Sequence, residues 1–305
     1  GDCVDSAHVP IGEWDVSTIT DMDEIFDGAS SFNGDVSEWD VASVTTMRVM
    51  FKEATSFTGD LSKWDVSSVV DMSGLFWGAS SFAGGLSEWD VSCVTSMDMV
   101  FHGATTFDED LTEWDVSGVE TMHGLFWGAT SFNGDVSKWD VSSVIMMDNL
   151  FLNADSFDGD ISKWDVSNVK SMFAMFSGAT SFNGDLSIWE VYNVQTMYGM
   201  FLGAKSFNSD ISKWEVFRVT NMHGMFSGAT LFNSDISEWE VSRVTTMYGM
   251  FMDAAAFNID ISKWDVSKVV TMDYMFWHLQ ATSFKHQLCS SAWVDSKASK
   301  IDMFT

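Results

Sequence analysis

The chain has 305 residues, of which 46% are hydrophobic, so it contains enough apolar material for a sizeable core. Its 44 acidic and 15 basic residues give a net charge of -29, which argues against nucleic acid and anionic membrane surfaces, because both require cations opposite phosphate. No apolar run approaches the roughly 18 residues that a membrane-spanning helix needs.

Residues 1–12 precede the first complete repeat and contain Pro10, the one proline of the chain. We expect this segment to act as an N-terminal cap, because the end of a repeat array exposes apolar cross-section and unpaired backbone.

Residues 13–277 form an array in which tryptophan returns every 25 residues without a slip. The repeated tryptophans are Trp14, Trp39, Trp64, Trp89, Trp114, Trp139, Trp164, Trp189, Trp214, Trp239 and Trp264. Self-similarity at a fixed period of about 20–50 residues is typical of a solenoid, so each tryptophan is predicted to mark one coil. Positions within a coil are numbered below from its tryptophan, which is position 0.

A short helix is predicted in each coil. In the first coil, Met22, Ile25, Phe26 and Ala29 occupy positions 8, 11, 12 and 15, the spacing of one helix face. Position 7 usually carries a good N-cap residue, and position 14 is usually glycine, a common helix stop. So short a helix is unstable alone and must be held by packing against neighbouring coils.

A short strand is predicted on the other side of each coil, roughly from position 18 to position 2 of the next coil. Residues 132–141 are a typical example, with β-branched and aromatic residues and no proline. Strands stacked at ~4.8 Å would form a parallel sheet in a rod of roughly 55 Å. The expected fold class is therefore an α/β solenoid of 25-residue coils, each with one short parallel strand and one short helix.

The repeat resembles a known family. Residues 133–142, with the sequence NGDVSKWDVS, show the pattern well. It is similar to the BspA-like leucine-rich repeats, and in particular to the "surface protein 26-residue repeat" branch, although the spacing here is strictly 25. The resemblance implies a leucine-rich-repeat-like solenoid on or outside the cell, without shared catalytic residues.

Aspartate recurs at position 21 of the coils, and two interpretations are open. Each carboxylate can accept hydrogen bonds from its own turn, or carboxylates of neighbouring coils can hold calcium. The candidate calcium ligands are Asp110, Asp135, Asp160, Asp185, Asp210, Asp235 and Asp260. No other cofactor is expected.

Aromatic residues gather at two positions of the predicted helix that would lie side by side on its outer face. They are Trp77, Trp127 and Trp277 at position 13, and Phe173, Tyr198 and Tyr248 at position 9. They are interpreted either as a protein interface or as shielding of a thin solenoid.

The three cysteines, Cys3, Cys93 and Cys289, should lie too far apart along a rod for an intrachain disulfide. Free thiols are one interpretation, and a head-to-tail bond between Cys3 and Cys289 of successive copies is the other. Residues 278–305 lose the register, with Trp293 arriving late, and are predicted to be a degenerate coil that serves as a C-terminal cap or contact segment.

The sequence contains no nucleophile–base–acid set, phosphate-binding loop or histidine cluster, so an enzyme is not expected. The favoured function is an extracellular or cell-surface structural or adhesive protein. It would bind a protein or glycan through a broad repetitive surface, and self-assembly end to end into filaments is a further expectation. The alternative is a surface recognition module that binds calcium or glycan.

Overall fold

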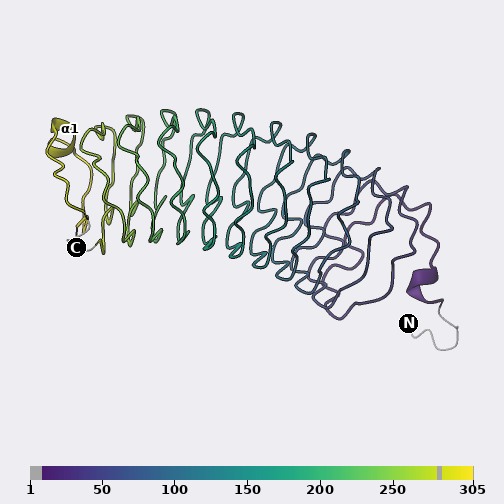
Figure 1. The fold of residues 1–305 in the computed structure, drawn as a ribbon. Coiled ribbons are helices and arrows are strands. Elements are labelled where there is room, and N and C mark those ends of the chain that lie inside the picture. Colours follow the sequence, from purple (N-terminus) through teal and green to yellow (C-terminus); the bar gives the residue numbers. More distant parts are fainter. Residues whose placement is uncertain (1–8, 280–283, 305) are drawn as a thin grey trace.

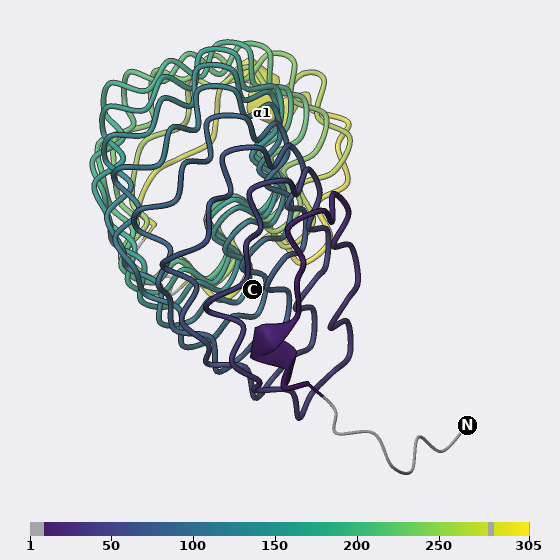
Figure 2. The ribbon, with the colours of Figure 1, turned by 90° about the vertical axis from the view of Figure 1, so that its right-hand side faces the viewer.

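The computed structural model describes residues 9–279 and 284–304, and it shows a solenoid. The coils stand side by side along a curved rod, with the first and last described coils at its opposite ends (Figure 1). Seen from the end that carries the first described coil, the coils lie one behind another around a common interior (Figure 2). The repeat solenoid expected from the tryptophan spacing is therefore present.

Regular secondary structure is sparse in the described residues. It consists of the 3-10 helix η1 (Ile11–Glu13) and the α-helix α1 (Ser291–Val294). Both lie near the ends of the rod, so the coils between them are held by other means.

One parallel β-bridge joins each coil to the next, at position 7 of every coil from Trp14 to Trp264. The series begins with Asp21 and Thr46 and ends with Thr271 and Ser299. The predicted strand was therefore misplaced: residues 132–141 form no bridge, and position 7, which had been interpreted as a helix cap, carries the sheet-like contact. A strand of one residue per coil is too short to show an alternating pattern in the sequence.

The helix predicted in each coil is absent, and consecutive turns replace it. In the fifth coil, the N–H of Leu125 donates to the carbonyl of Met122, and that of Ala129 donates to Phe126. Gly124 and Gly128 have φ values of 60° and 70°, which an α-helix excludes but the third residue of a type II turn requires.

The N–H groups at the positions between those that close the turns explain why a helix does not form. The N–H of Phe126 donates to the carbonyl of Leu150 in the next coil at 2.9 Å, and that of Gly128 donates to Leu152 at 2.7 Å. Alternate N–H groups thus bond to the neighbouring coil, while those between them close the turns. The neighbouring coil satisfies backbone groups that a short helix would leave unpaired at its ends.

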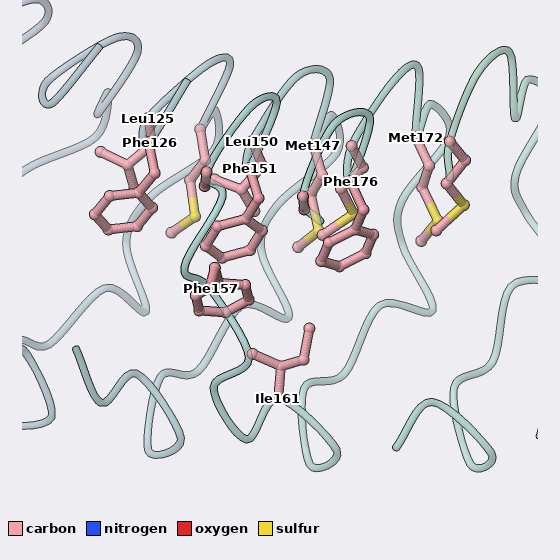
Figure 3. Close-up of a cluster of buried hydrophobic side chains, with 14 of the residues drawn as sticks. Leu125, Phe126, Met147, Leu150, Phe151, Phe157, Ile161, Met172 and Phe176 are labelled. Carbon is pink, nitrogen blue, oxygen red and sulfur yellow. The ribbon is translucent and has the colours of Figure 1, made fainter. Parts of the chain in front are cut away.

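Columns of identical side chains fill the interior (Figure 3). The ring of Phe151 lies 3.8 Å from that of Phe157 in the same coil and 5.5 Å from that of Phe176 in the next. The Nε1 of Trp164 donates to the carbonyl of Val136 in the preceding coil at 3.1 Å. This bond recurs from coil to coil, so each indole both packs against its neighbours and satisfies a buried carbonyl.

Residues 284–304 continue the stack. The buried Trp293 donates its Nε1 hydrogen to the carbonyl of Ile261 at 3.2 Å, and Phe284 stacks on Phe257 at 6.0 Å. α1 carries Trp293, and Ser299 makes the last bridge. Phe284 and Trp293 thus continue the columns although both come later in the sequence than the period of 25 predicts.

Candidate interaction surfaces

The aspartates at position 21 are each bonded within their own turn. Oδ1 of Asp110 accepts the backbone N–H of Thr112 at 2.9 Å and its hydroxyl at 2.7 Å, and these bonds hold the pKa of Asp110 below its usual value. The other six calcium candidates also accept the N–H two residues on: Asp135, Asp160, Asp185, Asp210, Asp235 and Asp260. This geometry is that of the hydrogen-bond interpretation.

The calcium interpretation depends on whether side chains of several coils come together as ligands. Within residues 9–279 and 284–304, no three histidine, cysteine, aspartate or glutamate side chains come together as metal ligands. Calcium usually takes six to eight oxygens, so a site here would have to draw ligands from several coils, and the calcium interpretation stays a prediction.

One coil lacks its aspartate, and a neighbouring glutamate takes its place. Gly85 occupies position 21 of the third coil, and its N–H donates to the carboxylate of Glu109 in the next coil. The same carboxylate accepts the N–H of Leu86 at 2.7 Å. Glu109 therefore acts as a substitute cap delivered from the next coil.

Replacing Glu109 with alanine should lower the free energy of unfolding by about 1–2 kcal/mol, because two partly buried N–H groups lose a charged acceptor. Urea unfolding followed by tryptophan fluorescence measures this loss. Glu88→Ala is the control, because the exposed Glu88 has no ion pair among the described residues. Equal losses in both variants would contradict the capping role.

The predicted aromatic residues lie in two columns, and Trp277 lies beyond the end of one of them. Phe173, Tyr198, His223 and Tyr248 stack with centroid separations of 4.7, 4.5 and 4.7 Å. A second column contains Trp77, His102 and Trp127, with separations of 5.1 and 4.4 Å. Trp277 makes an edge contact with Tyr274, whose ring lies 5.4 Å from that of Tyr248 in the first column.

The stacking determines which part of each aromatic ring is exposed to solvent. Phe173 is 37% exposed, whereas Tyr198 and Tyr248 are half-buried between neighbouring rings. Ring edges and the tyrosine hydroxyls are therefore presented, and most ring faces are covered.

His102 was missed by the sequence interpretation, although it occupies position 13 between the two tryptophans. Its Nδ1 is buried without a hydrogen-bond partner among the described residues. Burial lowers the pKa of His102, against an opposing effect of Glu53. The spacing of Trp77 and Trp127, two coils apart, was the signal that could have revealed it.

Acidification should therefore destabilise the Trp77–His102–Trp127 column. Because burial lowers the folded-state pKa of His102, its stabilising contribution is complete above the unfolded pKa of about 6.5 and is lost as the pH falls through the folded value. The melting temperature should fall between pH 7.5 and 5.5, and the fall should be smaller in His102→Phe. An identical fall in that variant would contradict this assignment.

The cysteine predictions are only partly covered by the structure. Cys93 and Cys289 are exposed free thiols. Cys3 lies outside the described residues, so a Cys3–Cys289 bond between copies stays a prediction.

In the described part of the chain, no helix combines the length and apolar character that a bilayer crossing demands.

Comparison with known proteins gives a family and one weak structural likeness. The model of the family described as "Mycoplasma protein of unknown function, DUF285" matches four overlapping segments, residues 2–113, 58–157, 133–230 and 203–305. No curated protein matches the chain. The overlapping matches agree with the internal repeat, while the resemblance to BspA-like repeats stays a prediction.

Among solved structures, the chain is similar to one titled "Crystal structure of TLR13-ssRNA13 complex", with 13% sequence identity and a TM-score of 0.28. The match covers 81% of this chain and 42% of that one, so this chain spans less than half of its length. A likeness this weak carries no information about fold or ligand.

Proposed function

The chain belongs to the family described as "Mycoplasma protein of unknown function, DUF285", and from that premise we propose that it is a structural or adhesive protein of the cell exterior. It binds a protein or glycan at the cell surface through its columns of repeated side chains, and it assembles end to end. Repeat solenoids commonly present extended binding surfaces of this kind.

The observation that carries the proposal is the polarity of the backbone bonding between coils. Even-numbered positions from 8 to 14 donate their N–H groups to carbonyls of the following coil. Position 6 donates in the opposite direction, to the preceding coil, as the N–H of Thr45 does to the carbonyl of Thr20 at 2.8 Å. At positions 8 to 14, an end of such an array, wherever it falls in the full-length protein, therefore presents either free carbonyls or free N–H groups, and at position 6 it presents the converse group. The two kinds of end are complementary.

The end coils of the described solenoid illustrate this complementarity. No hydrogen bond from a described residue reaches the carbonyls of Asp23 and Ile25, and the N–H groups of Asp302 and Phe304 donate to no described residue. Apolar side chains surround the first of these ends, where Trp14 is 53% exposed beside a cavity of about 680 Å³. A second copy stacked there would continue both the bonding and the columns.

Negative-stain microscopy of the isolated protein tests end-to-end assembly, with rods longer than one chain as the expected result. Ile25→Arg, at the exposed first coil, should shorten the rods, whereas Leu231→Arg, on the side of the rod, should not. Rods of single-chain length at every concentration would contradict the assembly.

Protease treatment of intact source cells tests the location. A cell-surface protein is cleaved while a cytoplasmic marker survives. Protection of the chain until the cells are lysed would contradict an exterior location.

A further inference from the structure

A hollow of about 430 Å³ lies on the outer surface between the coils of Trp189 and Trp214. Positions 24, 1 and 3 of the first coil and positions 24 and 1 of the second line it with Ile188, Glu190, Tyr192, Lys213 and Glu215. A hollow of about 250 Å³ occupies the matching place between the coils of Trp239 and Trp264, where the same positions carry Glu238, Glu240, Ser242, Lys263 and Asp265. The other lining residues are serine, tryptophan and valine in both. The two are called the Tyr192 hollow and the Ser242 hollow below.

The charged groups of the Ser242 hollow have partners within the chain. Nζ of Lys263 lies 2.5 Å from Oε1 of Glu238. Oε1 of Glu240 accepts the hydroxyl of the serine two residues on at 3.3 Å, and Oδ1 of Asp265 accepts the backbone N–H of Ser267 at 3.0 Å. Each charged side chain that lines this hollow is thus already bonded.

The corresponding partners are missing from the Tyr192 hollow. Ile188 stands where Glu238 stands in the other hollow, so Lys213 takes part in no ion pair among the described residues. In nine coils the acidic side chain at position 1 accepts a hydrogen bond from the residue two positions on. Glu190 and Glu215, which are followed there by tyrosine and phenylalanine instead of serine, accept none from the described residues. Three charged groups are therefore left for a ligand.

The chemistry of this hollow suits a guanidinium group. Glu190 and Glu215 are exposed at the same position of adjacent coils, so their backbones lie about 4.8 Å apart. A planar guanidinium can donate separate pairs of N–H groups to two carboxylates while its face stacks on an aromatic ring, here the half-buried Tyr192. Ile188 is 70% exposed and can cover the methylene groups of an arginine stem. Lys213 is free to donate to a carbonyl oxygen of the partner's backbone.

We propose that the Tyr192 hollow binds an arginine side chain that a protein partner presents. The site lies where the repeat is broken, so it goes beyond the proposed function and depends neither on the columns nor on end-to-end assembly. The net charge of -29 attracts a basic partner to the rod, and the unpaired carboxylates determine where its guanidinium docks. Arg218 lies over the ring of Phe217 and does not line the hollow, so it leaves the site open to a cation.

Calorimetric titration with a blocked pentapeptide, arginine at its centre and glycine or serine elsewhere, measures the binding. Citrulline in place of arginine keeps the shape and removes the charge, so it should weaken binding about tenfold or more. Lysine keeps the charge without the planar fork and should also bind more weakly than arginine.

An exchange of residue types between the two hollows locates the site. The loss variant Ile188→Glu, Tyr192→Ser, Glu215→Asp gives the Tyr192 hollow the residue types of the Ser242 hollow, and it should weaken binding of the arginine peptide about tenfold or more. This variant makes the chain more negative, so a merely non-specific attraction of the cationic peptide would become stronger instead.

The opposite exchange should create a second site. The gain variant Glu238→Ile, Ser242→Tyr, Asp265→Glu gives the Ser242 hollow the residue types of the Tyr192 hollow, so the titration should count two peptides per chain instead of one. Melting curves show whether each variant is folded, and Tyr192→Ser alone, with the same expected direction, serves if the loss variant is not.

No binding at about 1 mM arginine peptide, equal affinity for the arginine and citrulline peptides, unchanged affinity in the loss variant, or a single site in the gain variant overturns the proposal. A neutral oligosaccharide that binds in place of the peptide, and whose binding the loss variant removes, would also overturn it and make the hollow a glycan site. None of these results bears on end-to-end assembly or on the exterior location, which microscopy and protease treatment measure separately.

Discussion

Replacing Phe151 with alanine should lower the free energy of unfolding by about 3–5 kcal/mol, the largest effect expected of a single substitution. Phe151 is fully buried and stacks with Phe157, Phe126 and Phe176 at 3.8, 5.5 and 5.5 Å. The coils above and below are fixed by their own backbone bonds, so they cannot collapse into the space that the ring leaves.

The matched control is Phe173→Ala, which removes a phenylalanine from the surface column. Phe173 is 37% exposed and stacks only on Tyr198, at 4.7 Å, so its loss should cost about 0.5–1.5 kcal/mol. Urea midpoints compared under identical conditions measure both changes. Similar losses at the two sites would show that Phe151 is not part of a rigid core.

Gly134→Ala should cost about 1–3 kcal/mol, because the new methyl group would meet backbone rather than a movable side chain. A Cβ at Gly134 would overlap the carbonyl oxygen of Glu109 in the neighbouring coil. The two coils must move apart to remove this overlap, and that movement weakens the hydrogen bonds and the stacking between them.

Gly118→Ala is the control for this change. A Cβ there would lie 3.6 Å from its nearest neighbour, the carbonyl of Ser92, which is ordinary contact. The substitution should be neutral or slightly stabilising, because alanine reduces the freedom of the unfolded chain. A Gly134→Ala variant as stable as Gly118→Ala would contradict the close approach of the coils at Glu109.

The solenoid was predictable from the sequence because a buried tryptophan at a fixed period demands that every coil place it in the same environment. The path of the chain within a coil was not predictable from the sequence. Met122, Leu125, Phe126 and Ala129 have the spacing of a helix face, but consecutive turns bring the same residues inward. Spacing reports which side chains are buried, and it does not distinguish a helix from turns whose alternate N–H groups bond to the next coil.

The surface features were predictable to the extent that they depend on one repeat position. The aspartate turns follow from aspartate and serine two residues apart, as at Asp135 and Ser137. The substitute cap from Glu109 to Gly85 and Leu86 involves two coils, and only the structure reveals it. His102 lies between Trp77 and Trp127. Its position could have been predicted only by expecting unlike side chains at one repeat position to stack on each other.

Spin-label distances between exposed serines at position 17 test the central claim, that each tryptophan marks one coil laid on the last. In a chain whose cysteines are replaced by serine, labels at Ser56 and Ser131 are three coils apart, and labels at Ser56 and Ser181 are five coils apart. At about 4.8 Å per coil, the account predicts separations of about 15 and 25 Å, in the ratio of the coil numbers. Separations that do not grow with the number of intervening tryptophans would contradict it.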